Sequence, residues 1–168
     1  DVSAKPVTAR EASAAGRVLL SDKAVAALRS GNVTKGDALA VARVAGIAAV
    51  KRTPDLTPLA HPLAVHAVSV DLCVVDAGVE IRATVRTADR TGIEMEALTA
   101  VAVAALTVID MVKAIDKHGR ITDIRVTAKS GGRSGDWVEA GRAIWLAAGR
   151  WWSPCPPARR QGSIPTAG

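Results

Sequence analysis

Phe and Tyr are absent from this sequence, and its four Trp residues all lie at or after Trp137. The chain before Trp137 therefore lacks the aromatic side chains on which single-stranded nucleic acid stacks. The formal net charge is +6, from 22 Lys and Arg against 16 Asp and Glu. This excess favours an anionic ligand, and we expect a small molecule rather than nucleic acid as the partner.

Cysteine is scarce. Cys73 and Cys155 are the only two, and they make neither a disulfide framework nor a zinc pattern. The first ten residues, DVSAKPVTAR, lack the basic and apolar regions of a secretory signal. We therefore expect reduced cysteines and a cytoplasmic protein. No Cys or carboxylate stands at metal-ligand spacing from the histidines, so no metal site is predicted.

Apolar runs of membrane length are also missing. The Ala-, Val- and Leu-rich run from Ala97 to Ile109 is too short to cross a bilayer, and we expect no membrane partner. It lies within a longer segment, Thr91 to His118, whose composition favours a long buried helix with charged residues at both ends.

The two charged ends of this helix are far apart. Glu94 lies sixteen residues before Asp110, which corresponds to about 24 Å at helical rise. The ends therefore serve two sites, or one site shared between chains. Asp110 and Lys113, one turn apart, could share proton transfer or form an ordinary surface salt bridge. Glu94 and Glu96 could contact a ligand or only offset the positive end of the helix.

The remaining segments predict helices packed on one face of a mainly antiparallel sheet, an α+β fold. Strands are expected at 11–20, 64–75, 79–87 and 121–128, and helices from the Ser21 cap to Arg29 and after Asp37. The proline-containing stretch 53–63 is expected to be irregular. Composition changes near residue 137, so we predict a domain over 1–137 and a Trp-, Pro- and Arg-rich tail over 138–168. Within the tail, 138–152 could form an amphipathic helix, and 153–168 is expected to be disordered.

Four further features have both a functional and an ordinary interpretation. Lys35 at a helix start could bind an anion or mark a turn. Lys51 could meet a triphosphate or complement a helix C-terminus. His61 could be a general acid or base, or a solvated loop residue. The glycine-rich loop over 129–135 could bind phosphate or be a flexible connector.

Three segments taken together resemble the cyclic pyranopterin monophosphate synthase family, the molybdenum cofactor biosynthesis protein C. They are KGDALAVARVAGIAAVKRTPDLTPLAHPL from Lys35, TGIEMEALTAVAVAALTVIDMVKAID from Thr91, and KSGGRSG from Lys129. The resemblance spans residues 1–137. It implies a ferredoxin-like α+β fold in a homohexamer, a trimer of dimers with active sites between subunits. The implied lyase reaction converts 3′,8-cyclo-7,8-dihydroguanosine triphosphate to cyclic pyranopterin monophosphate and diphosphate.

The resemblance also implies roles for individual residues. The catalytic residues would be Asp110, Lys113 and Lys35, the last as a proton donor. The substrate-binding residues would be His61; Glu94, Met95 and Glu96, which would recognise the base; and Lys51 and Lys129, which would bind the triphosphate. The family implies no metal for catalysis and leaves magnesium as an optional companion of the substrate triphosphate.

The chain departs from the family pattern at three places. Ala60 stands where the family usually has Cys, and Ile109 and Val112 replace a usual Tyr and a frequent Cys. The tail after Trp137 resembles nothing in the family. These departures motivate an alternative function, a catalytically weak paralogue that binds guanine nucleotides or a partner protein.

Overall fold

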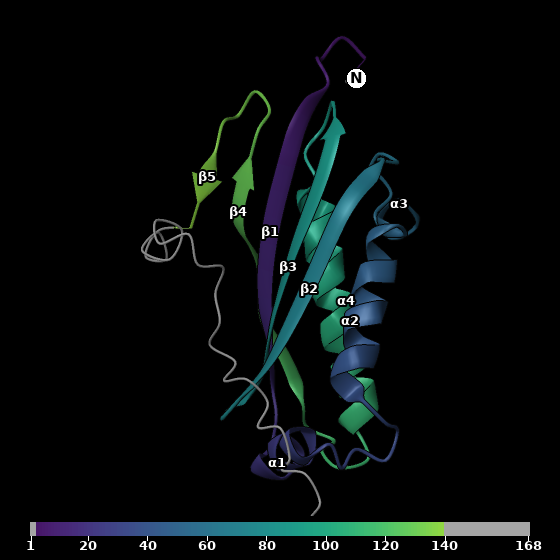
Figure 1. Cartoon of the computed structure of the whole chain (residues 1–168), viewed down its shortest axis with the longest axis vertical. Coiled ribbons are helices and arrows are strands. Elements are labelled where there is room, and N and C mark those ends of the chain that lie inside the picture. The colour runs from purple at the N-terminus through teal and green to yellow at the C-terminus, as the bar shows by residue number, and fades with distance from the viewer. Residues whose placement is uncertain (1–2, 140–168) are drawn as a thin grey trace, which may run out of the picture.

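The computed structural model describes residues 3–139, which form a five-stranded sheet with helices on one face (Figure 1). In chain order the elements are β1 (Thr8–Leu19), α1 (Asp22–Ser30), α2 (Ala38–Val50), α3 (Thr53–Leu56), β2 (Val65–Val75), β3 (Gly78–Asp89), α4 (Glu94–Val112), β4 (Arg120–Ser130) and β5 (Trp137–Val138).

The strands lie in the order β2-β3-β1-β4-β5, and every neighbouring pair is antiparallel. Because β1 and β2 both run opposite to β3, which lies between them, they run in the same direction. The connection from β1 to β2 passes through α2, and the connection from β3 to β4 passes through α4. This split β-α-β arrangement is the ferredoxin-like topology, and it confirms the predicted fold class.

The hydrophobic core lies between the sheet and the pair α2 and α4. β1 directs Ala12, Ala14 and Val18 towards the helices, alternating with more polar residues, as a half-buried strand requires. α4 lies in this core along most of its length, and its buried residues are mainly Ala and Val. By length and composition alone α4 could cross a membrane, but half of its apolar window is already buried inside the described chain.

The helices α2 and α4 approach closely because small residues face each other. A Cβ added to Gly46 of α2 would lie 2.9 Å from the carbonyl oxygen of Ala100 and 3.2 Å from Cβ of Ala104, both in α4. The helices run antiparallel, since Lys35, just before α2, contacts Asp110 near the end of α4. This close contact fixes the position of α4 along its whole length.

Most predicted elements are confirmed, including their caps. Ser21 caps α1 through its hydroxyl, which accepts a hydrogen bond from the Ala24 N–H, and Gly31 ends the helix in the left-handed conformation. Asp37 caps α2 in the same way, accepting from Ala40. These caps were predictable because they depend on short-range hydrogen bonds.

Two predictions about secondary structure were wrong. The stretch 53–63 is not wholly irregular, because α3 forms at its start. Pro54 lies in the first turn of α3, where a missing N–H removes no helical hydrogen bond. Val138, expected to begin a helix, lies in β5, which pairs with β4 through Ala128 and Lys129. The rest of the predicted helix and tail, residues 140–168, lies outside the described residues, and the domain boundary at 137 stays a prediction.

The state of the Cys73 thiol does not agree with the expectation of reduced cysteines. It is buried in β2 and is not a free thiol in the part of the chain that the structure describes. Cys155 lies outside that part, so nothing here supports the expected redox state.

We predict that Gly46→Ala destabilises the protein. Alanine in a helix interior normally gains about 1 kcal/mol over glycine, but here its Cβ meets a backbone carbonyl that cannot move aside. Measured by urea denaturation, the free energy of unfolding of the variant should be about 1–3 kcal/mol lower than that of the unaltered protein. Ala48→Gly, on the exposed side of α2, is the reverse control and should lose about 1 kcal/mol from helix propensity alone. A more stable Gly46→Ala variant would contradict close helix packing.

Candidate active site

Polar side chains gather at the two opposite ends of α4. In Figure 1, α3, the N-terminal residues and the loop between β4 and β5 lie at the upper end, and α1 lies at the lower end. The first residues of α4 face a pocket at the upper end, and its last turn carries a cluster of charges at the lower end. The pocket and the cluster each contain residues that the sequence motifs predicted.

The lower cluster joins one carboxylate to two ammonium groups. Asp110 Oδ1 lies 2.7 Å from Nζ of Lys113, and Asp110 Oδ2 lies 2.8 Å from Nζ of Lys35. Lys35 also donates to the backbone carbonyl of Asp110 at 2.8 Å. The pair within α4 was predicted from spacing. The arrival of Lys35, 75 residues away, depends on the antiparallel packing of α2 and α4.

The two lysines keep the Asp110 carboxylate ionised. Hydrogen bonds from Lys113 and then from Lys35, with their charges, lower the pKa of Asp110 to about 2. At neutral pH this carboxylate therefore carries no proton to donate, and its hydrogen-bonding capacity is directed at the two ammonium groups. The cluster can hold the two lysines in place as proton donors or as cations facing a ligand.

Asp116 holds the end of α4 in place just beyond this cluster. Its carboxylate accepts hydrogen bonds from the backbone N–H of Ser21 at 2.6 Å and of His118 at 2.9 Å. The Ser21 hydrogen bond, followed by the one from His118, lowers the pKa of Asp116. Through these bonds the start of α1 is tied to the turn after α4, which restricts movement of the adjacent Lys113 segment.

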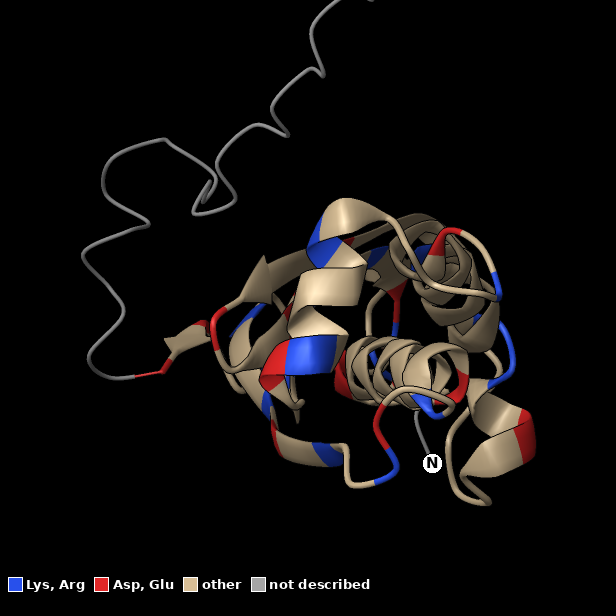
Figure 2. Ribbon diagram, turned by 90° about the horizontal axis from the view of Figure 1, so that it is seen from below, with Lys and Arg blue, Asp and Glu red and all other residues tan. Residues whose placement is uncertain are grey.

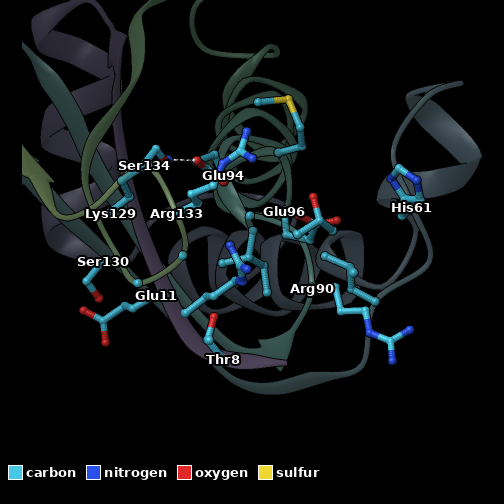
Figure 3. Close-up of a pocket in the computed structure, with 18 of the residues that line it drawn as sticks. Thr8, Glu11, His61, Arg90, Glu94, Glu96, Lys129, Ser130, Arg133 and Ser134 are labelled. Carbon is cyan, nitrogen blue, oxygen red and sulfur yellow. Dashed lines mark hydrogen bonds and ion pairs between the residues drawn. The ribbon is translucent and has the colours of Figure 1, made fainter. Parts of the chain in front are cut away.

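The upper pocket has a volume of about 1050 Å³ (Figure 3). Its walls come from the start of β1, the loop after α3, the first turn of α4, the end of β4 and the glycine-rich loop after β4. Five cationic residues line it against three carboxylates. The cations are Lys5, Arg10, Arg90, Lys129 and Arg133, and the carboxylates are Glu11, Glu94 and Glu96.

Glu94 is held by the glycine-rich loop region. Its Oε1 accepts from Lys129 Nζ at 2.9 Å, and the same ammonium donates to Ser134 Oγ at 2.8 Å. Burial acts to raise the pKa of Glu94, but hydrogen bonds from Lys129 and the Glu94 backbone, with the charges of Lys129 and Arg10, lower it overall. The carboxylate also occupies the space where a side chain on Gly92 would be, so a larger residue there would displace the Glu94 carboxylate.

Glu96 is the more buried carboxylate, with only 3% of its surface exposed. Burial raises the pKa of Glu96; its own backbone N–H opposes this, and the nearby Glu94 charge adds to it. Figure 3 shows Glu96 between the Lys129 side of the pocket and His61 on the other side. A buried carboxylate beside a cavity is suited to accept N–H groups from a ligand.

The structure brings together most of the predicted binding residues. His61, Glu94, Met95, Glu96 and Lys129 all line the upper pocket. Ala60, where the family usually has Cys, lines it too. The second departure lies away from the pocket, because Val112 belongs to the core and Ile109 packs at its edge.

Lys51 is the predicted binding residue that does not line this pocket. It is the exposed C-cap of α2, at the same end of the helix pair as the pocket. Its placement agrees with the helix-end interpretation within one chain, and a contact with triphosphate stays a prediction.

Sequence reasoning missed the contribution of the N-terminal segment. Thr8 and Arg10 in β1 line the pocket, as does Arg90 before α4. Nothing in the spacing of DVSAKPVTAR indicated this, because the strand register that brings it to the pocket is a tertiary feature.

Charges elsewhere on the described chain are mostly paired or scattered. Figure 2, viewed from the end that carries α1, shows short blue and red segments rather than one continuous basic tract. Among residues 3–139, no group of three or more His, Cys, Asp or Glu could hold a metal ion.

Comparison with known proteins gives one consistent result. The sequence model of the MoaC family matches residues 1–132. The cyclic pyranopterin monophosphate synthase of Streptomyces coelicolor is 65% identical over 140 residues, covering 83% of this chain and 82% of the relative. That of Nocardioides sp. is 66% identical over 140 residues, covering 82% and 86%. Cyclic pyranopterin monophosphate synthase 2 of Mycobacterium tuberculosis is 57% identical over 138 residues, covering 82% and 83%.

We predict that Asp110 contributes to stability in a pH-dependent way. Because its folded-state pKa is depressed from 3.8 to about 2, its contribution is fully present above pH 3.8 and is lost as the pH falls towards 2. The difference in free energy of unfolding between the unaltered protein and Asp110→Asn, from urea denaturation at successive pH values, should shrink over that interval.

The matched pair for this experiment is Lys113→Met and Lys117→Met. Lys113 contacts Asp110, whereas Lys117 is an exposed lysine four residues further along the chain, beyond the end of α4. Lys113→Met should reduce the acid dependence and Lys117→Met should leave it unchanged. Equal effects of the two variants would show that the ion pair with Lys113 does not depress the Asp110 pKa.

Proposed function

The chain belongs to the MoaC family, and from this premise we propose that it is a cyclic pyranopterin monophosphate synthase, a lyase of molybdenum cofactor biosynthesis. The reaction converts (8S)-3′,8-cyclo-7,8-dihydroguanosine 5′-triphosphate to cyclic pyranopterin monophosphate and diphosphate. One observation carries the proposal beyond sequence similarity. The two residue sets marked by the motifs form two polar groupings, one at each end of a single buried helix.

The upper pocket supports recognition of the purine-derived base. A guanine-type ring presents N–H donors, and Glu96 offers a buried carboxylate that makes no ion pair with the other described residues. Glu94 is held in place by its ion pair with Lys129, so Glu96 is the carboxylate that can accept hydrogen bonds from the base. Met95, 43% exposed, gives the ring an apolar contact at the pocket wall.

The lower cluster supports the proton transfers. Opening the purine ring and closing the pterin ring both move protons, and diphosphate departure needs positive charge nearby. Lys35 and Lys113 supply two ammonium groups, fixed at 2.8 and 2.7 Å from one carboxylate. In this proposal the Asp110 carboxylate positions both lysines and balances their positive charge. Lys35 donates a proton to the substrate.

The distance between the ends of α4 supports a site shared between subunits. Glu94 and Asp110 are separated by about 24 Å along the helix, so a reacting ring cannot contact both in one chain. We therefore propose a homohexamer, a trimer of dimers, in which the lower cluster of one subunit faces the upper pocket of another. Lys51 of a neighbouring subunit would then be available to the triphosphate.

No metal is assigned a catalytic step in this proposal, and magnesium would only accompany the substrate triphosphate. Localisation in the cytoplasm stays a prediction from the sequence. The alternative function is a catalytically weak paralogue that binds guanine nucleotides or a partner protein. Its specific support is Ala60, which lines the pocket beside His61 in place of the usual Cys.

We predict that the purified protein forms cyclic pyranopterin and diphosphate from the cyclised nucleotide, and that Lys113→Ala reduces turnover at least 100-fold, because loss of a general acid or base costs roughly that much or more. Gel filtration should show the same oligomer for both proteins. Lys117→Ala, an exposed lysine without a described ion pair to Asp110, is the matched control. Near-normal turnover by Lys113→Ala would remove Lys113 from the mechanism.

The same assay separates the two functions. Strong turnover by the unaltered protein would exclude the weak paralogue. Absent turnover that Ala60→Cys restores would favour it.

Shared sites predict complementation between inactive variants. Asp110→Asn damages only the lower cluster, and Glu96→Gln damages only the upper pocket. Each variant alone should have little turnover, whereas a mixture refolded or co-expressed together should regain part of it, because some sites then combine two intact halves. A mixture no more active than its components, with mixed oligomers demonstrated by mass spectrometry, would place each site within one chain.

A further inference from the structure

The loop that carries His61 has few contacts upstream of this residue. Residues 57–64 connect α3 to β2, and residues 60–64 form neither helix nor strand. Leu59 is 90% exposed, so this side of the loop contributes little packing. His61 nevertheless lines the upper pocket, on the side across from Lys129 (Figure 3). Contacts on the other side of His61 therefore hold it at the pocket.

One hydrogen bond fastens the end of this loop to the sheet. Thr87 in β3 donates from its hydroxyl to the backbone carbonyl of Ala64 at 2.6 Å. Among the described residues, this is the only hydrogen bond that the backbone of residues 61–64 makes. Leu63 adds an apolar contact, since it is partly buried against the core. The Thr87 hydroxyl thus supplies the polar contact that fixes where the loop joins β2.

The backbone ladder between β2 and β3 does not supply this contact, because its register shifts at the same place. The shift lies between Val65 and Ala67, so His66 is an extra residue on β2. The His66 side chain accepts a hydrogen bond through Nδ1 from the backbone N–H of Ala88 at 3.2 Å. At the start of β2, side-chain hydrogen bonds from Thr87 and to His66 therefore supplement the irregular backbone pairing.

Thr87 itself lies outside the pocket. It is only 4% exposed and follows Val85 by two residues, on the face of β3 that packs against the helices. It is not one of the residues that line the pocket. Its hydroxyl is therefore held in place by the core, and any effect of this hydroxyl on a ligand passes through Ala64.

The connection from Ala64 back to His61 is short and stiff. Pro62 fixes its own φ and confines the His61 backbone to extended conformations. A displacement of Ala64 is therefore carried to His61 rather than absorbed by the backbone between them. The imidazole has no hydrogen-bond partner among the described residues, so its place depends on the backbone that carries it.

We infer that Thr87 is a positioning residue for His61, which it holds at the pocket through its hydrogen bond to Ala64. This rests on the proposed function, in which His61 contacts the substrate. Without the hydroxyl, the Ala64 carbonyl can bind water instead, because Ala64 is exposed. The fold then loses little, whereas the loop gains freedom. The loss falls on the reaction, since a small misplacement of a group that contacts the substrate lowers the rate.

The experiment combines kinetics with variants that differ in the hydroxyl. Thr87→Val replaces the hydroxyl by a methyl group and should lower kcat/KM for the cyclised nucleotide about 2- to 10-fold, the range that corresponds to one intramolecular hydrogen bond. Thr87→Ser keeps the hydroxyl and should retain nearly the full value. In a His61→Ala background, Thr87→Val should have no further effect, because the group that Thr87 positions is gone.

Thr84→Val is the matched control. Thr84 is a buried threonine of the same strand, its hydroxyl is hydrogen-bonded to that of Ser13 at 2.8 Å, and it does not line the pocket. This variant should leave kcat/KM unchanged. Thermal unfolding and gel filtration of each variant separate a displaced loop from a lost fold. Thr87→Ala takes the place of Thr87→Val if the latter does not fold.

A second readout does not depend on turnover. The chain has three histidines, so isotope-labelled histidine gives few NMR signals, and the signal of His61 is the one that His61→Ala removes. Thr87→Val should shift or broaden this signal, whereas Thr87→Ser and Thr84→Val should leave it unchanged. The signal of His118, beyond the other end of α4, is the internal reference and should not move.

Four results would overturn the inference. They are an unchanged His61 signal in Thr87→Val, a loss of kcat/KM in Thr87→Ser as large as in Thr87→Val, a loss of the same size with and without His61, and the same loss in Thr84→Val. Turnover by the unaltered protein that Thr87→Val leaves intact would reject the positioning role and keep the synthase function. A His61 signal that moves as expected in a protein without turnover would reject the synthase function and keep the positioning of His61 by Thr87.

Discussion

The burial of α4 between α2 and the sheet holds both polar ends of this helix in position. Its inward residues are small, so the backbone of α2 at Gly46 comes within contact of the Ala100 carbonyl. Close-packed interiors do not deform continuously. A helix held this tightly keeps its two ends at a fixed separation, and both ends carry the polar groups on which the proposed chemistry relies.

Burial and pairing with lysines then set the ionisation of the carboxylates at each end of α4. At the lower end, two lysines share one carboxylate, which leaves Asp110 ionised and the ammonium groups oriented. At the upper end, Lys129 neutralises Glu94, whereas burial raises the pKa of Glu96. The pocket therefore holds one carboxylate that is already paired and one that a ligand can engage. Such prior arrangement lowers the reorganisation needed when substrate binds.

The order of the strands matters as much as the helix. Because β1 lies in the middle of the sheet, between β3 and β4, its first residues lie beside the loop that follows β4. Arg10 is thereby tied to Asp89 at the end of β3 and covered by Gly132. A segment of mixed polar composition becomes part of a binding pocket through this placement alone.

The local elements and the residue types at the site could be predicted from the sequence. Caps at Ser21 and Asp37, the β2–β3 hairpin and the charged ends of α4 all follow from interactions between residues close in the chain, which a sequence displays directly. The motifs in addition marked Lys35 and Lys129 as site residues. Packing between distant segments places Lys35 beside Asp110, leaves Lys51 outside the pocket and brings Thr8 and Arg10 into it. Those placements depend on helix packing and strand order, which join residues far apart in the chain and leave no periodic signal in it.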